Sequence, residues 1–193
     1  MTSIFENKKL CVFDFDETLI SSPDHKIKVV KKTGETLFLN SEAWNRYTPN
    51  ATDTFDFSSL EKASNIKIIE KTWKVFLERL GALGFESVHI LSARGSRSPV
   101  EKFFSSQGIK VQISCLGIAP GENNGYHKAL WVENKIKNEN ISVVEFFDDR
   151  EDCVASIMEL STKYQGVDFY VWKITDGKPV PATRKDLTSL PQV

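Results

Sequence analysis

Two carboxylates, Asp14 and Asp16, directly follow a short apolar run, Leu10–Phe13. The run is β-branched and aromatic, so it predicts a buried strand. Unpaired carboxylates beside a core are costly unless they bind a metal ion or a proton. One of the pair could attack phosphorus as a nucleophile while the other protonates the leaving group. Taken alone, the pattern fits a capping aspartate with a solvated neighbour equally well.

A second polar cluster, Ser92-Ala93-Arg94, follows another expected strand, Ser87–Leu91. The Ser92 hydroxyl and the nearby backbone N–H groups are suited to binding a phosphoryl group. Serine at the end of a strand is more often a turn former or a helix cap. This cluster therefore gains weight only together with the first.

Adjacent carboxylates, Asp148 and Asp149, follow a third expected strand, Val143–Phe147. Neighbouring carboxylates repel one another unless a cation lies among them, and Mg²⁺ is the hard cation that such oxygens bind. The alternative is that Asp149 or Asp152 caps the next helix. The cluster predicts a magnesium site shared with the first pair.

A lysine is needed to neutralise a carboxylate nucleophile and a phosphate together. Lys128, which we expect to open a helix after the loop Pro120–Tyr126, lies between the other clusters in the chain, and Lys135 is a second choice. Most lysines on helices are only solvated. The assignment of Lys128 therefore depends on its order among the motifs.

Length and composition predict one globular domain. The chain has 193 residues, 40% hydrophobic and 26% charged, and a net charge of −1, which excludes a whole-molecule basic surface for nucleic acid. The three cysteines, Cys11, Cys115 and Cys153, show no metal-ligand spacing and indicate buried thiols in a reducing compartment. Residues 1–9 lack the apolar segment of a signal peptide, and no apolar run approaches a membrane span, so we expect a cytoplasmic protein that does not bind membranes.

Strand-like and helix-like segments alternate along residues 1–175. The helical patterns cover Ile66–Leu80, Pro99–Gln107, Lys128–Lys137 and Asp152–Tyr164, and the remaining expected strands are Val111–Cys115 and Val167–Trp172. This alternation predicts an α/β fold, a three-layer Rossmann-like parallel sheet with helices on both faces. Ligands of such sheets bind beyond the carboxyl ends of the strands, where the polar clusters fall.

An insertion, residues 21–65, interrupts this alternation after the first strand. Its segment Ile27–Leu39 predicts a β-hairpin that turns at Thr33-Gly34. Lysines such as Lys32 could follow a phosphate backbone and Trp44 could stack on a base, although lysines also protect ordinary edge hairpins. Residues 176–193, which include three prolines, predict a loosely ordered tail.

Four motifs in this order resemble the haloacid dehalogenase-like superfamily. They are Asp14-Phe15-Asp16-Glu17-Thr18, Ser92, Lys128 and Asp148-Asp149, each at the end of an expected strand or helix. The resemblance covers roughly residues 10–172 and implies a phosphatase with a small cap, similar to small phage and bacterial phosphatases related to polynucleotide 3′-phosphatase domains.

The resemblance also implies a role for each motif. Asp14 would form an aspartyl-phosphate, Asp16 would act as general acid and base, Ser92 would bind the phosphoryl group and Lys128 would balance charge. Mg²⁺ would bind Asp14, the Asp16 carbonyl and the Asp148–Asp149 pair, and which aspartate of that pair is the direct ligand varies within the superfamily. We assign substrate contacts to Thr18, Ala93, Arg94, Lys32 and Trp44.

The expected function is therefore Mg²⁺-dependent hydrolysis of a phosphomonoester, with a nucleotide or a nucleic-acid 3′-phosphate end as the leading substrate. No Gly-x-x-x-x-Gly-Lys-[Ser/Thr] phosphate loop is present, so a bifunctional enzyme with a kinase of that type is excluded. Two alternatives remain, a non-catalytic protein that binds a nucleotide or phosphorylated ligand and a small-metabolite phosphatase. The sequence does not indicate an oligomeric state.

Overall fold

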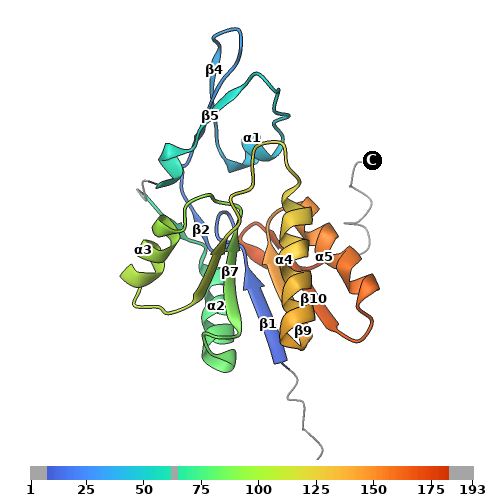
Figure 1. Ribbon diagram of the computed structural model, residues 1–193. Helices are drawn as coiled ribbons and strands as arrows, with labels where there is room; N and C mark the ends of the chain where they lie inside the picture. Colours follow the sequence, from blue (N-terminus) through green and yellow to red (C-terminus); the bar gives the residue numbers. More distant parts are fainter. Residues whose placement is uncertain (1–7, 62–64, 183–193) are drawn as a thin grey trace, which may run out of the picture.

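A six-stranded sheet forms the centre of the computed structural model, which describes residues 8–61 and 65–182 (Figure 1). The strand order is β11-β10-β9-β1-β7-β8, and β1, β7, β8, β9 and β10 run parallel. The last strand pairs antiparallel with its neighbour, so the sheet is mixed rather than wholly parallel as expected. Its strands are β1 (Lys8–Phe13), β7 (Val88–Ser92), β8 (Gln112–Cys115), β9 (Ile141–Asp148), β10 (Asp168–Thr175) and β11 (Lys178–Pro181).

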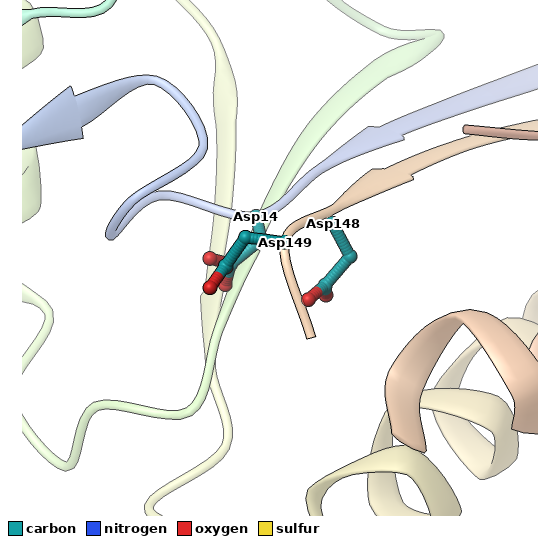
Figure 2. A group of neighbouring side chains, drawn as sticks. All are labelled: Asp14, Asp148 and Asp149. Carbon is teal, nitrogen blue, oxygen red and sulfur yellow. The ribbon is translucent and has the colours of Figure 1, made fainter. Parts of the chain in front are cut away.

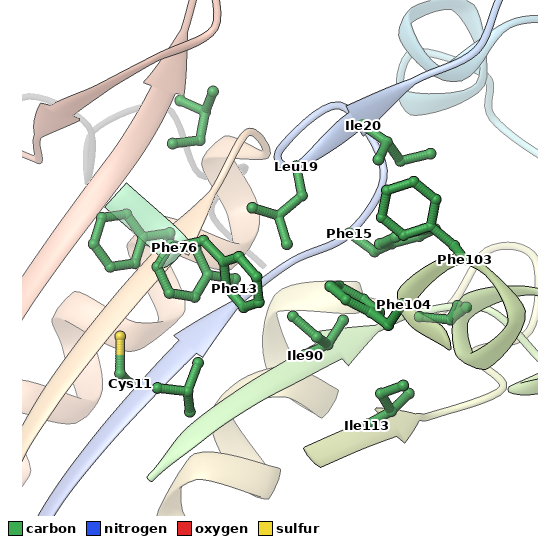
Figure 3. Packing of buried hydrophobic residues seen from close by; sticks show 14 residues of the cluster. Cys11, Phe13, Phe15, Leu19, Ile20, Phe76, Ile90, Phe103, Phe104 and Ile113 are labelled. Carbon is green, nitrogen blue, oxygen red and sulfur yellow. The ribbon is translucent and has the colours of Figure 1, made fainter. Parts of the chain in front are cut away.

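Helices cover both faces of this sheet, which confirms the α/β class. Phe76 of α2 (Glu70–Leu83) and Phe104 of α3 (Ser98–Ser106) belong to one buried apolar cluster (Figure 3). Val132 of α4 (Asn124–Glu139) and Ile157 of α5 (Glu151–Lys163) belong to a second cluster. Burial of these apolar stripes against the sheet is what fixes the helices in place.

A stack of aromatic rings crosses the middle of the sheet. The rings of Phe13 in β1 and Phe147 in β9 lie parallel with centroids 4.2 Å apart, and Trp172 in β10 stacks on Phe147 at 5.9 Å. Phe13 and Phe147 are paired in the ladder, and the Asp14 N–H donates to the Phe147 carbonyl at 2.9 Å. Because both rings are buried, they fix the register of the residues that follow them.

The insertion forms a small second layer of structure beyond the carboxyl ends of β1 and β7 (Figure 1). Its base is a two-stranded pair, and above it lies a three-stranded antiparallel sheet in the order β4-β3-β5. The predicted hairpin is confirmed as β3 and β4, whereas β5 was not expected. The elements are β2 (Ile20–Ser21), β3 (Ile27–Val30), β4 (Thr36–Leu39), α1 (Ser41–Asn45), β5 (Thr54–Asp56), the 3-10 helix η1 (Ser58–Glu61) and β6 (Lys67–Ile68).

The expected loose tail is wrong for residues 176–182. Asp176 and Gly177 adopt positive φ values of 50° and 68° and form the turn that returns the chain as β11 along β10. The predictions for the N-terminus (1–9) and the tail (176–193) fall partly on residues 1–7 and 183–193, which lie outside the described residues. All three cysteines are free thiols, two of them buried. Within 8–61 and 65–182 no helix has the length and apolar character needed to cross a bilayer.

Candidate active site

Three carboxylates converge at the carboxyl ends of β1 and β9 (Figure 2). Asp14, Asp148 and Asp149 each offer one oxygen, and these three oxygens all lie within 4.8 Å of one another. Asp14 and Asp148 are buried and Asp149 is half-buried. The predicted strand ends therefore meet as expected, and the acidic clusters form one group.

A tight turn after β1 sets the direction of the first motif. The Phe15 carbonyl accepts the N–H groups of both Leu19 and Ile20, and Glu17 adopts the left-handed conformation with φ of 56°. A non-glycine residue in this conformation is uncommon and marks a turn held by its surroundings. The chain thus folds back at once and leaves the Asp14 side chain at the edge of the sheet.

Thr18 positions a carboxylate and does not contact the pocket. Its side chain is completely buried, and its hydroxyl donates to Asp149 at 3.4 Å. It is absent from the pocket lining. The structure does not bring Thr18 to the cavity, because the turn directs its hydroxyl to Asp149.

Lys128 lies between two of the three carboxylates. Its Nζ donates to Asp14 at 2.6 Å and to Asp148 at 2.7 Å, and its side chain is 1% exposed. Helix α4 begins one turn earlier than expected, because the Asn123 side chain caps it by accepting the Tyr126 N–H. The predicted lysine is thus brought to the predicted aspartates.

The close packing of α4 against α5 determines where Lys128 stands. A Cβ atom at Gly125 would overlap the Asp152 carbonyl and crowd the Ser156 hydroxyl, so only glycine allows this approach. The second-choice Lys135 instead donates to Glu139 at 2.6 Å, away from the site.

Burial and mutual repulsion shift the acidic group toward protonation. Burial raises the pKa of Asp14, the neighbouring Asp148 and Asp16 raise it further, and Lys128 opposes them, so that the pKa lies at about 7. Burial, Asp148 and Asp14 likewise raise the pKa of Asp149 well above its usual value. A divalent cation would relieve this repulsion, and carboxylate oxygens are the ligands that Mg²⁺ prefers.

Asp16 lies in a different electrostatic environment. The Arg94 guanidinium donates two hydrogen bonds to the Asp16 carboxylate, Nε to Oδ2 at 2.7 Å and Nη2 to Oδ1 at 2.6 Å. Burial raises the pKa of Asp16, but Arg94 and His25 outweigh it and lower the pKa to about 2. The Asp16 carboxylate therefore does not join the metal-binding candidates, and the resemblance assigns only its carbonyl to the metal.

Arg94 also joins the sheet edge to the insertion. Its Nη1 donates to the Leu60 carbonyl in η1, and its Nη2 lies 3.3 Å from His25 Nδ1. His25, buried at 4% exposure, was missed from the sequence, since a lone histidine in an insertion carries no pattern. Leu60 acts through its backbone, which no residue type reveals.

A cavity of about 610 Å³ opens over these groups between the sheet edge and the insertion. Asp149 lines it and Asp148 does not. Of the other predicted site residues, Lys32 lies in the hairpin turn after β3 and does not line the cavity. The predicted site residues that do line it are Asp14, Asp16, Ser92, Ala93, Arg94, Lys128 and Trp44.

Ser92 is held at the floor of this cavity. It is 1% exposed, and its Oγ accepts the Arg94 N–H at 3.2 Å. Three strand ends (β1, β7 and β9), one helix and the insertion thus bring together carboxylates, a buried lysine and a hydroxyl around one cavity. No protein-family model, curated protein or solved structure matches this chain, so its function is inferred from this site.

Proposed function

We propose that the protein is a Mg²⁺-dependent phosphomonoester hydrolase of the haloacid dehalogenase-like type that acts through an aspartyl-phosphate on a nucleotide or a nucleic-acid 3′-phosphate end. The observation that carries the proposal is the group of Asp14, Asp149 and Lys128, which line the cavity, together with the buried Asp148 that Lys128 contacts. Buried carboxylates with a raised pKa in a cleft are typical of functional sites. A core role alone gives no reason to keep three of them together.

The donor set fits Mg²⁺. Asp14 and Asp149 line the cavity, whereas both Asp148 oxygens already accept hydrogen bonds, from Lys128 and from the Arg150 N–H at 3.0 Å. We therefore assign direct coordination to Asp14 and Asp149 and a supporting role to Asp148. The bound ion would supply positive charge that offsets the phosphate oxygens.

Asp14 is the nucleophile in this proposal. One oxygen of its carboxylate bonds to phosphorus as the bond to the leaving oxygen breaks, and water later cleaves the aspartyl-phosphate. Lys128, whose Nζ lies 2.6 Å from Asp14, offsets the negative charge that gathers when phosphate enters. Ser92 is placed to donate to a phosphoryl oxygen.

Asp16 serves as the proton carrier. With its pKa at about 2 it is a carboxylate, which suits the removal of a proton from the attacking water. To protonate the leaving group it must first gain a proton, which the Arg94 ion pair opposes. Because Arg94 also lines the cavity, an entering phosphate competes for its guanidinium and thereby raises the pKa of Asp16.

One observation favours the alternative of a binding protein without turnover. The bidentate Asp16–Arg94 pair disables the acid form of Asp16 in the absence of substrate. A phospho-ligand binding protein could keep such a pair permanently. Turnover separates the two functions.

The test is phosphate release from p-nitrophenyl phosphate with and without Mg²⁺. We expect Mg²⁺-dependent hydrolysis by the wild type and a loss of at least about 10³-fold in kcat for Asp14→Asn. The control is Asp168→Asn, because Asp168 is exposed at the start of β10; it should retain wild-type activity. Circular dichroism should show that both variants fold. Full Mg²⁺-dependent activity in Asp14→Asn would falsify the proposal.

A further inference from the structure

An aromatic cluster forms one wall of the active-site cavity. The insertion contributes Trp44, Tyr47 and Phe57 to the lining of the same cavity as Asp14. The Trp44 ring meets Phe55 and Phe57 edge-on, with centroids 5.6 and 5.7 Å away, which leaves its orientation fixed by packing. The insertion therefore presents rigid ring surface to whatever occupies the cavity.

Tyr47 adds to this wall without offering its hydroxyl. That hydroxyl donates to Asp53 at 2.6 Å, so the polar end of the side chain is already satisfied. The loop between β8 and α4 adds Ile118 and Pro120 to the lining. The cavity thus offers apolar and aromatic surface, which suits a flat ring.

The balance of charged side chains that line the cavity favours a substrate with a single phosphate group. Among the described residues its cationic side chains are Arg94, Lys128 and Arg150, and each is already paired, with Asp16, with Asp14 and Asp148, and with Asp152. The carboxylates that line it are Asp14, Asp16, Glu17, Glu61, Glu122 and Asp149. Even with the two positive charges of a bound Mg²⁺, six carboxylates against three cationic side chains leave the lining negative, which disfavours a second anionic group beyond the metal-bound phosphate.

We infer that the substrate is a nucleoside monophosphate, whose single phosphate reaches Asp14 and whose neutral nucleoside places its base against Trp44. The inference rests on the proposed function and narrows its substrate. A planar base matches the aromatic wall, and an uncharged leaving group matches the acidic lining. A nucleic-acid strand end fits less well, because its next phosphates would meet Glu61 or Glu122 instead of lysines.

The lysines of the hairpin do not supply the missing positive charge. Lys26, Lys28, Lys31 and Lys32 are absent from the cavity lining, and Lys31 pairs with Glu35 at 2.9 Å. A strand that entered the cavity would therefore gain none of the phosphate contacts that dominate polynucleotide affinity there.

The experiment compares kcat/KM for matched substrates with Mg²⁺. Adenosine 3′- and 5′-monophosphates are set against the base-free ribose 3- and 5-phosphates and against a 3′-phosphorylated tetranucleotide. We expect the better mononucleotide to exceed its base-free counterpart by at least about 10-fold, the size of one base–aromatic stack. Trp44→Leu should raise KM for the mononucleotide much more than for the base-free substrate and so remove most of that preference.

The matched control is Phe38→Leu, since Phe38 is 64% exposed on β4 and lies outside the cavity lining. It should keep the full preference. Equal rates with and without the base, an unaffected preference in Trp44→Leu, or faster hydrolysis of the tetranucleotide would overturn the inference.

Binding measured by calorimetry distinguishes failure of the nucleoside site from failure of the proposed hydrolysis. If no ester releases phosphate, hydrolysis is refuted, but calorimetry still tests whether the base binds against Trp44. Adenosine monophosphate should then bind the wild type with a Kd at least about 10-fold below that of ribose phosphate, and Trp44→Leu should remove the difference. Equal affinities would refute the nucleoside site itself.

Discussion

The carboxyl edge of the sheet and the insertion above it hold their polar groups in opposite ways. At the edge, Asp14, Asp148 and Lys128 are buried and bound to one another at 2.6–2.7 Å. In the insertion, charged pairs such as Lys31–Glu35 lie exposed at 2.9 Å. Buried charges depend strongly on each partner, while exposed pairs contribute little.

This difference predicts different sensitivities to substitution. The edge is fixed by aromatic packing that fully buries Phe13 and Phe147, whereas the aromatic cluster of the insertion (Trp44, Tyr47, Phe55 and Phe57) is only half-buried. Arg94 bonds to both regions, through Asp16 on one side and the Leu60 carbonyl on the other. Substitutions should therefore be severe at the edge, intermediate at Arg94 and slight in the hairpin.

Replacing Lys128 should have the largest effect. Lys128→Met removes the cation from a buried acidic group and should lower the free energy of unfolding by about 3–5 kcal/mol in the absence of metal. Lys135→Met, on the same helix, should change it by about 0.5 kcal/mol or less. Urea denaturation of both variants measures this, and equal losses would show that the edge is no more sensitive than the surface.

Arg94→Lys tests the connection between the regions. Lysine cannot reproduce the bidentate grip, so kcat should fall about 10- to 100-fold, a loss of one or two charge-assisted hydrogen bonds. The pKa of Asp16, now about 2, should rise toward its usual value, and the acid limb of the kcat profile should move to higher pH. Arg97→Lys, which alters an exposed pair with Glu101, is the control, and an unmoved acid limb in Arg94→Lys would contradict the assignment.

Replacing His89 tests whether a buried histidine of the central sheet makes the free energy of unfolding depend on pH. Burial, aided by Lys135, lowers the pKa of this β7 histidine to about 4, below the unfolded value of about 6.5. The unfolded chain therefore binds a proton first, and stability falls as pH drops from 6.5 toward 4. Asp14, whose pKa is raised to about 7, acts in the opposite direction over this range, so the effect of His89 is the difference between variants: between pH 7 and pH 5 the wild type should lose about 1–2 kcal/mol relative to His89→Gln. Denaturation curves at both pH values measure it, and His127→Gln, half-exposed on α4, should keep the full loss.

The smallest effect is expected at the hairpin turn. Lys32→Ala should leave stability and mononucleotide hydrolysis within about twofold of wild type, since exposed surface substitutions rarely matter. A steep loss of activity, or a change in its dependence on salt concentration, would show that the hairpin reaches the substrate and would erase the contrast between the two regions.

The edge could be predicted from the sequence because its signals are local. Asp14 and Asp148 each follow a buried apolar run, and parallel strands must bring such ends together. Contacts that depend on how the insertion docks left no such signal. His25 and the Leu60 carbonyl were therefore missed, and Thr18 was assigned to substrate although the turn at Glu17 directs it to Asp149.

The antiparallel strand β11 was missed for another reason, which bears on how the molecule behaves at high concentration. Its Pro179 and Pro181 indicated a break, but proline is tolerated on an edge strand whose outer side needs no N–H donor. Because Pro179 and Pro181 are two residues apart, their backbone nitrogens point to the same side of β11, and neither carries an N–H donor. A second chain could not easily extend the sheet there, so this border resists the strand addition that leads to aggregation.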